Sequence, residues 1–181
     1  MINNRRSFIT GIKSTSLSTK EKNFLKNFKP WGVILFSRNI KSIEQVNNLT
    51  KEIRKIFQDR KYPVLLDQEG GRINRLKSFI NTDIFTSKFF GDLFLKDKKK
   101  FNDYYKIYVD KTSYLLKQIG INLNTIPVLD IRYKGSNNIV GDRSFSEKIK
   151  VINDIGSITI KSFHKNNIGT VIKHIPGHGL A

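Results

Sequence analysis

The chain has 181 residues and a mass of 21.0 kDa, enough for one folded domain but too few for two of ordinary size. It contains no cysteine, which excludes disulfide frameworks, cysteine-ligated metals and thiolate nucleophiles. Its 33 Lys and Arg against 15 Asp and Glu give a formal charge of +18, an excess that favours a polyanionic partner unless it reflects drift in composition.

The first predicted strand covers residues 32–36, a short run of β-branched and aromatic residues typical of a strand buried on both faces. An amphipathic helix is predicted over residues 42–58, where apolar side chains recur at helical spacing and Ser42 can cap the first turn. A second buried strand, residues 62–66, ends at Asp67.

The rest of the chain continues the alternation of strands and helices. Residues 72–103 are less regular and predict a long loop with a short helix, and loops of this length are usually functional. Two helix–strand pairs follow, over residues 104–119 with 121–128 and over residues 146–163 with 169–172. This order of elements indicates an α/β fold with a parallel sheet.

Two architectures are built from such units, the open doubly wound sheet and the closed eightfold barrel. A barrel needs about 250 residues, so four predicted strands in a shorter chain amount to half of one. The last residues form a Pro-Gly-His-Gly loop with no helix after the fourth strand. If the fold is a barrel, we expect this chain to be its first half.

Polar residues stand where each predicted strand ends. They are Arg38 with Asn39, Asp67, Asp130, and Lys173 with His174. The carboxyl ends of parallel strands meet at one edge of a sheet, where both architectures build their sites. Capping or turn formation explains any one of these positions, but the four together favour a site lined by acids and bases.

The densest motif covers residues 67–76 and begins Asp-Gln-Glu-Gly-Gly-Arg. Two glycines after a carboxylate allow a sharp turn against a ligand, and Arg72 and Arg75, three apart, can both face it. Sugar hydroxyls or a carboxylate-bearing ligand suit this group. An acid/base pair of Asp67 and Glu69 is an alternative, although residues two apart at a bend need not converge.

Further features of the sequence concern metal binding, nucleotide binding and the location of the protein in the cell. His174 and His178 are four apart, but Pro176 and Gly177 between them exclude a helix, so the sequence predicts no metal site. The absence of a P-loop, G-x-G-x-x-G or G-x-S-x-G motif disfavours nucleotide-binding and esterase functions. No signal-peptide core or membrane-spanning run is visible, which predicts a cytoplasmic protein without membrane contact.

Five motifs together resemble glycoside hydrolase family 3, and in particular its cytoplasmic single-domain β-N-acetylhexosaminidase branch, which acts in peptidoglycan recycling. In the order of the family they occupy residues 32–39, 67–76, 120–130, 141–145 and 173–179. The resemblance implies a TIM-type (β/α)8 barrel without a cofactor. It makes residues 1–181 the N-terminal half of the catalytic domain, with barrel motifs from about residue 30 onward.

The resemblance also implies roles for single residues. Asp67 matches the carboxylate that binds sugar hydroxyls, and the other implied contacts to the N-acetylglucosamine ring are Arg75, Arg143, Lys173 and His174. The family's mechanism is retaining hydrolysis through a glycosyl-enzyme intermediate. Its nucleophile and acid/base are expected beyond Ala181, so no catalytic residue is expected within this chain, which should be inactive alone. The implied partner is a small N-acetylglucosamine-containing oligosaccharide or muropeptide.

Two other functions stay open. A β-glucosidase of the same family is one, although that group is usually larger and often secreted. A basic nucleic-acid-binding module is the other, because of the charge. The 24 Lys, 17 Asn and 25 Ile all have A/T-rich codons, however, and the lysines are spread along the chain, which favours compositional drift and makes a nucleic-acid partner the weaker hypothesis.

Overall fold

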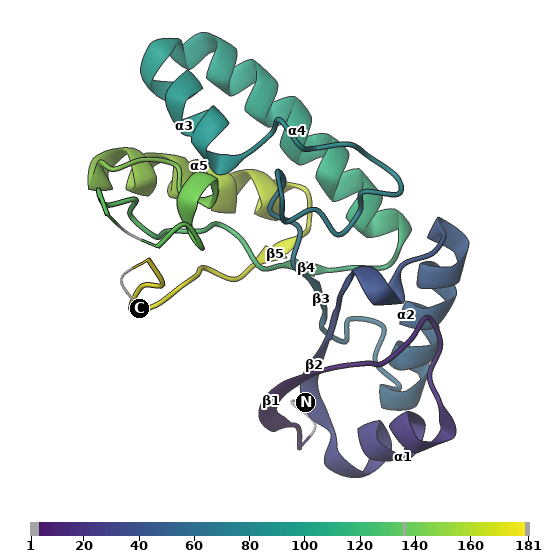
Figure 1. Ribbon diagram of the computed structural model, residues 1–181. Coiled ribbons are helices and arrows are strands. Elements are labelled where there is room, and N and C mark those ends of the chain that lie inside the picture. Colours follow the sequence, from purple (N-terminus) through teal and green to yellow (C-terminus); the bar gives the residue numbers. More distant parts are fainter. Residues whose placement is uncertain (1–3, 136, 180–181) are drawn as a thin grey trace.

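The computed structural model describes residues 4–135 and 137–179, and it contains one five-stranded parallel sheet (Figure 1). The strands are β1 (Arg6–Gly11), β2 (Pro30–Leu35), β3 (Val64–Leu66), β4 (Leu123–Asn124) and β5 (Gly169–Thr170). Their order in the sheet is their order along the chain, and every neighbouring pair is parallel. The prediction of an α/β fold with a parallel sheet is confirmed.

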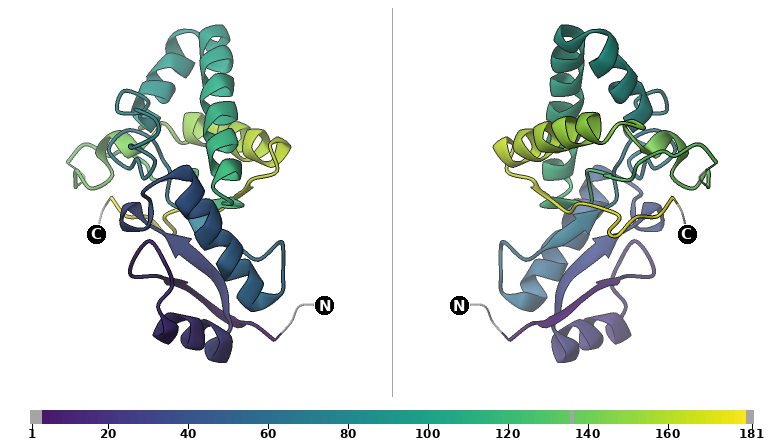
Figure 2. Two further views of the ribbon diagram at one scale, coloured as in Figure 1. Left: turned by 90° about the vertical axis from the view of Figure 1, so that its right-hand side faces the viewer. Right: turned by 90° about the vertical axis from the view of Figure 1, so that its left-hand side faces the viewer.

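Helices connect these strands. They are α1 (Thr19–Phe28), α2 (Ile43–Phe57), α3 (Ser87–Lys96), α4 (Lys98–Gln118) and α5 (Ile149–Lys165), with short 3-10 turns at η1 (Ser37–Asn39) and η2 (Gly141–Arg143). Figure 2 shows α1 and α2 beside the first strands, and α3, α4 and α5 gathered at the opposite end of the molecule. The long predicted loop contains α3, as expected, and also the first six residues of α4.

The first strand and helix were not predicted, so the expectation of four strands beginning near residue 30 was wrong by one strand. The residues of strand β1 alternate between exposed and partly exposed, which hides the strand from a search for buried apolar runs. Helix α1 has one buried residue, Leu25. Its start nevertheless carries a recognisable signal, because Ser18 and Glu21 form a capping box.

Other boundaries differ for local reasons. Helix α2 begins after Ser42, whose hydroxyl accepts the Gln45 N–H at 3.1 Å as predicted. Helix α4 begins at Lys98, six residues earlier than predicted, because Asp97 caps it. The third predicted strand is regular only over β4, since Pro127 has no N–H for the sheet; parallel pairing returns beyond it, at Val128.

Both faces of the sheet are apolar, but they differ in how far they are covered. Val33, Leu35, Val64 and Leu66 lie on the face covered by the helices and are fully buried. Residues of the other face include Ile9, Ile34, Leu65 and Leu123, which the strand register places on one side. Ile9 is 45% exposed, so this second face is apolar without being fully covered by the described residues.

Gly91 lets helix α3 lie directly against the chain that follows η2. A methyl group on Gly91 would lie 1.7 Å from the carbonyl oxygen of Phe145. We expect Gly91→Ala to destabilise the protein by about 2 kcal/mol, because backbone must move to accept the added carbon. Thermal unfolding should show a melting temperature lower by about 4–8 °C. Alanine normally stabilises a helix interior relative to glycine, so an unchanged or higher melting temperature would contradict this packing.

Candidate sugar-binding site

Asp67 follows β3 directly and lies at the carboxyl end of the sheet, where its carboxylate has three partners. The hydroxyl of Thr125 donates to Oδ1 at 2.8 Å, and Nη2 of Arg75 donates to Oδ2 at 2.8 Å. Nζ of Lys173, which follows β5, also binds Oδ1. Three segments of the chain therefore converge on one carboxylate.

These partners determine the charge of Asp67. Burial alone would raise the pKa of this carboxyl, but the nearby Lys173 ammonium and the hydrogen bonds from Lys173, Thr125 and Arg75 outweigh burial and lower it. The lowered pKa keeps Asp67 ionised, so its oxygens can only accept hydrogen bonds.

Glu69 is the second carboxylate at this edge, and its side chain is only 2% exposed. Arg143 of η2 holds both of its oxygens, with Nη2–Oε1 at 2.7 Å and Nε–Oε2 at 2.8 Å. Lys173 Nζ lies 2.5 Å from Oε1. Lys173 thus bridges Asp67 and Glu69, and both carboxylates are engaged by cations, an arrangement that favours binding over an acid/base pair.

Asp130 fixes the ring of His174 beside this network. Its Oδ2 lies 2.6 Å from Nδ1 of His174, and its Oδ1 accepts the backbone N–H of His178 at 2.7 Å. Burial would raise the pKa of Asp130, but the hydrogen bonds from His174 and His178 lower it overall. Nη2 of Arg143 lies 3.4 Å from Nε2 of His174, so the imidazole ring lies between Asp130 and Arg143.

The loop after β3 folds back so that Arg75 lies next to Asp67, because the Gln68 side chain binds the backbone at the other end of this loop. The amide oxygen of Gln68 accepts the backbone N–H groups of Arg75 and Leu76 at 2.8 and 3.1 Å. Gly70 has a φ of +96°, and a Cβ there would lie 2.5 Å from the Phe85 carbonyl oxygen. The predicted sharp turn is present, and glycine is required at it.

Three residues predicted to contribute lie outside this site. Arg72 does not face Asp67 with Arg75; it pairs with Asp142 at 3.0 Å and donates to backbone carbonyls of residues 138–140. Arg38 and Asn39 bind the loop that follows β1, each donating to the carbonyl of Ile12. The missed first strand explains this second error, because its loop offers the acceptors that these side chains bind.

A hollow of about 450 Å³ adjoins the network and is lined on one side by Asp130, His174 and His178. The two imidazole rings lie 5.0 Å apart. Within residues 4–135 and 137–179, no cluster of three or more His, Asp or Glu side chains is arranged to hold a metal ion. The site thus offers carboxylate acceptors and charged or imidazole groups beside an open space.

All five residues that the resemblance singled out lie in this one network: Asp67, Arg75, Arg143, Lys173 and His174. Sequence reasoning missed Thr125 and left Glu69 without a positioning role, although Glu69 stands in the densest motif. A parallel sheet with helices in the connections between its strands and a charged site at the carboxyl ends of the strands is the architecture of a TIM-type barrel half.

Residues 8–181 match the model of the glycosyl hydrolase family 3 N terminal domain, so the chain belongs to this family. It is 29% identical over 171 residues to a beta-hexosaminidase of Xanthomonas campestris, covering 94% of this chain and 50% of that protein. A beta-hexosaminidase of Hydrogenovibrio crunogenus is 31% identical over 168 residues, 93% of this chain and 46% of that protein. The chain spans about half the length of these curated relatives.

Solved structures also match this chain over nearly its whole length. NagZ from Neisseria gonorrhoeae in complex with N-trifluoroacetyl-D-glucosamine has a TM-score of 0.86 and 28% identity, with 97% of this chain and 52% of that chain covered. The same protein in complex with zinc ion has a TM-score of 0.87 and 28% identity, with 98% and 53% covered. In the part of this chain that the structure describes, no helix combines the length and apolar character needed to cross a membrane.

Proposed function

We propose that this chain supplies the sugar-binding half of a family 3 glycoside hydrolase that removes terminal β-linked N-acetylglucosamine with retention of configuration. The observation that carries the proposal is Lys173, which bridges Asp67 and Glu69 at the carboxyl end of the sheet. Fixed acceptors and donors side by side suit the vicinal hydroxyls of a sugar ring.

Each polar group has a role in this proposal. Asp67 accepts hydrogen bonds from two ring hydroxyls, and Lys173 and Arg75 donate to the same part of the sugar. His174 presents Nε2, because Asp130 binds its Nδ1 proton. Arg143, held by Glu69, donates nearby. The names of the relatives, beta-hexosaminidase, and the N-trifluoroacetyl-D-glucosamine complex of NagZ support this sugar class.

The catalytic groups are a separate part of the proposal. Retaining hydrolysis needs a carboxylate nucleophile and an acid/base. Asp67, Glu69 and Asp130 are all engaged by cations or N–H groups, so none of the three is assigned to these roles. We expect both groups in the half of the family's catalytic domain that this chain does not cover.

Steady-state kinetics on the complete protein as its gene encodes it tests the proposal. We expect hydrolysis of an aryl N-acetyl-β-D-glucosaminide with a kcat/KM at least about 100-fold above that of the aryl β-D-glucoside, a difference of about 2.7 kcal/mol in transition-state binding. Residues 1–181 expressed alone should show no turnover. A preference for the glucoside would favour the β-glucosidase alternative, and turnover by residues 1–181 would overturn the division of roles.

The finer assignments are tested separately. We propose a muropeptide or oligosaccharide that ends in N-acetylglucosamine as the substrate, and release of free N-acetylglucosamine from muropeptides measures it. The cytoplasmic location stays a prediction, which cell fractionation tests. For the nucleic-acid alternative, affinity should fall steeply with salt concentration, because phosphate contacts release counterions, whereas sugar binding should not.

A further inference from the structure

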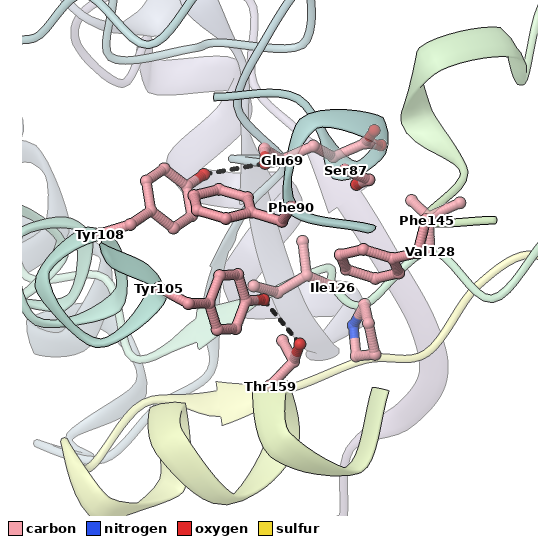
Figure 3. A pocket seen from close by; sticks show the side chains of 10 residues that line it. Glu69, Ser87, Phe90, Tyr105, Tyr108, Ile126, Val128, Phe145 and Thr159 are labelled. Atoms are coloured by element: carbon pink, nitrogen blue, oxygen red, sulfur yellow. Dashed lines mark hydrogen bonds between the residues drawn. The ribbon is translucent and has the colours of Figure 1, made fainter. Parts of the chain in front are cut away.

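Tyr108 of α4 does not reach the proposed sugar-binding groups directly, but it contacts the backbone of Glu69. Its hydroxyl donates to the Glu69 carbonyl oxygen at 2.8 Å. Figure 3 shows this hydroxyl directed at Glu69, whereas the hydroxyl of Tyr105, one turn earlier on α4, is directed at Thr159, 2.6 Å away. Both rings line a cavity of about 10 Å³ between α4, α5 and the loop after β3.

Aromatic contacts fix the position of the Tyr108 ring. Its ring packs against Phe85, Phe90 and Tyr105, with centroids 5.1 to 6.0 Å away. Burial raises the pKa of Tyr108, so its hydroxyl stays protonated and remains a donor. A Cβ at Gly70 would lie 2.6 Å from this hydroxyl, which shows how closely the loop is pressed against it.

The contact reaches the site in two steps. Tyr108 fixes the carbonyl of Glu69, and the carboxylate of the same residue holds Arg143 through two bonds and Lys173 through one. If the Glu69 backbone moves, its carboxylate moves too. The paired hydrogen bonds from Arg143 to the two carboxylate oxygens depend on geometry, so such a movement weakens them. The position of two cations of the site therefore depends on a hydroxyl that does not reach it.

We infer that Tyr108 is a positioning residue of the site: through Glu69 it sets the placement of Arg143 and Lys173 for the sugar. This inference rests on the proposed function. Tyr108 contacts neither the sugar-facing groups nor, in the proposal, the substrate, and its hydroxyl reaches the site through Glu69; its other hydrogen bond, with Thr112, lies within α4.

The experiment compares Tyr108→Phe with Tyr105→Phe in the complete protein. Each variant removes one tyrosine hydroxyl from the same helix and the same cavity, and only the first loses a bond to Glu69. We expect Tyr108→Phe to raise KM for the aryl N-acetyl-β-D-glucosaminide by about fivefold with kcat changed less than twofold, as for the loss of one hydrogen bond. Tyr105→Phe should leave both constants unchanged.

A second readout does not depend on activity. The Nε–H signal of Arg143 in a nitrogen-15 NMR spectrum, identified by its loss in Arg143→Lys, reports the fork to Glu69 directly. We expect its solvent exchange to become about fivefold faster in Tyr108→Phe and to stay unchanged in Tyr105→Phe. Equal behaviour of the two variants in both measurements would overturn the inference. An inactive wild-type protein with the expected exchange pattern would count against the proposed function alone.

Discussion

Replacing Asp67 by alanine is expected to lower kcat/KM of the complete protein by at least about 100-fold. Asp67 is proposed to accept two sugar hydroxyls, and charge-assisted hydrogen bonds are worth about 1.5–3 kcal/mol each. At 1.36 kcal/mol per factor of ten, two such bonds give this loss or more. The structure adds a second cause, because Asp67 also holds Arg75 and Lys173 in position. Steady-state kinetics with an aryl N-acetyl-β-D-glucosaminide measures the effect.

Two further variants make the Asp67 result specific. Asp67→Asn keeps the shape of the side chain and removes its charge, so a comparable loss would assign the effect to the carboxylate and not to a cavity. Lys99→Ala changes the charge at an exposed position in the first turn of α4 and should have no effect. Wild-type kinetics for Asp67→Ala together with impairment of Lys99→Ala would refute the sugar site and favour a polyanion partner.

Lys173→Met is expected to destabilise the protein by about 3 kcal/mol at neutral pH. The Lys173 side chain is 14% exposed and its ammonium lies between Asp67 and Glu69, so its removal leaves two nearly buried carboxylates without the cation they share. Methionine keeps most of the side-chain volume. Thermal unfolding should show a melting temperature lower by about 6–12 °C.

The pH dependence of this loss follows from Asp67. Its pKa is below the unfolded value of about 3.9, so its ionised form stabilises the fold above that pH and this stabilisation disappears as pH falls through the folded pKa. Without Lys173 the pKa of Asp67 rises and less stabilisation remains to be lost. The stability difference between wild type and Lys173→Met should therefore be largest above about pH 5 and should shrink below about pH 4.

Lys106→Met is the matched control for Lys173→Met. Lys106 is 73% exposed and pairs with Asp110 one turn along α4, a kind of pair worth about 0.5 kcal/mol or less. Its loss should barely change the melting temperature at any pH. Equal effects of the two substitutions, or a difference that stays constant into acid, would be incompatible with Lys173 as the bridge between two carboxylates.

The sequence was most informative where one physical signal dominated. Helix α2 combines regular apolar spacing with a serine cap, and its predicted bounds differ from the observed ones by one residue at each end. Helix α4 was placed too late, since the lysines at its start resemble a solvated run and only Asp97 marks the true beginning. Strand β1 was missed because its residues alternate in exposure and do not form an apolar run.

The residues of the site could be predicted from the sequence only in part. Strand ends and the Asp-Gln-Glu-Gly-Gly-Arg motif were sufficient to place Asp67 and Lys173 at one edge, because parallel strands share their carboxyl ends. Arg143 lies in a 3-10 turn 74 residues after Glu69, and no local pattern indicates that their side chains meet. Only the family resemblance brought Arg143 into the prediction, and only the three-dimensional structure identifies its partner.

The order of the strands has a consequence for biosynthesis. Each strand pairs with the one made just before it, so the sheet can be extended in the direction in which a ribosome delivers the chain. Asp67 and Glu69 emerge about a hundred residues before Lys173, and during that interval their shared cation does not yet exist. The network of charges therefore closes only when the segment that follows β5 has been made.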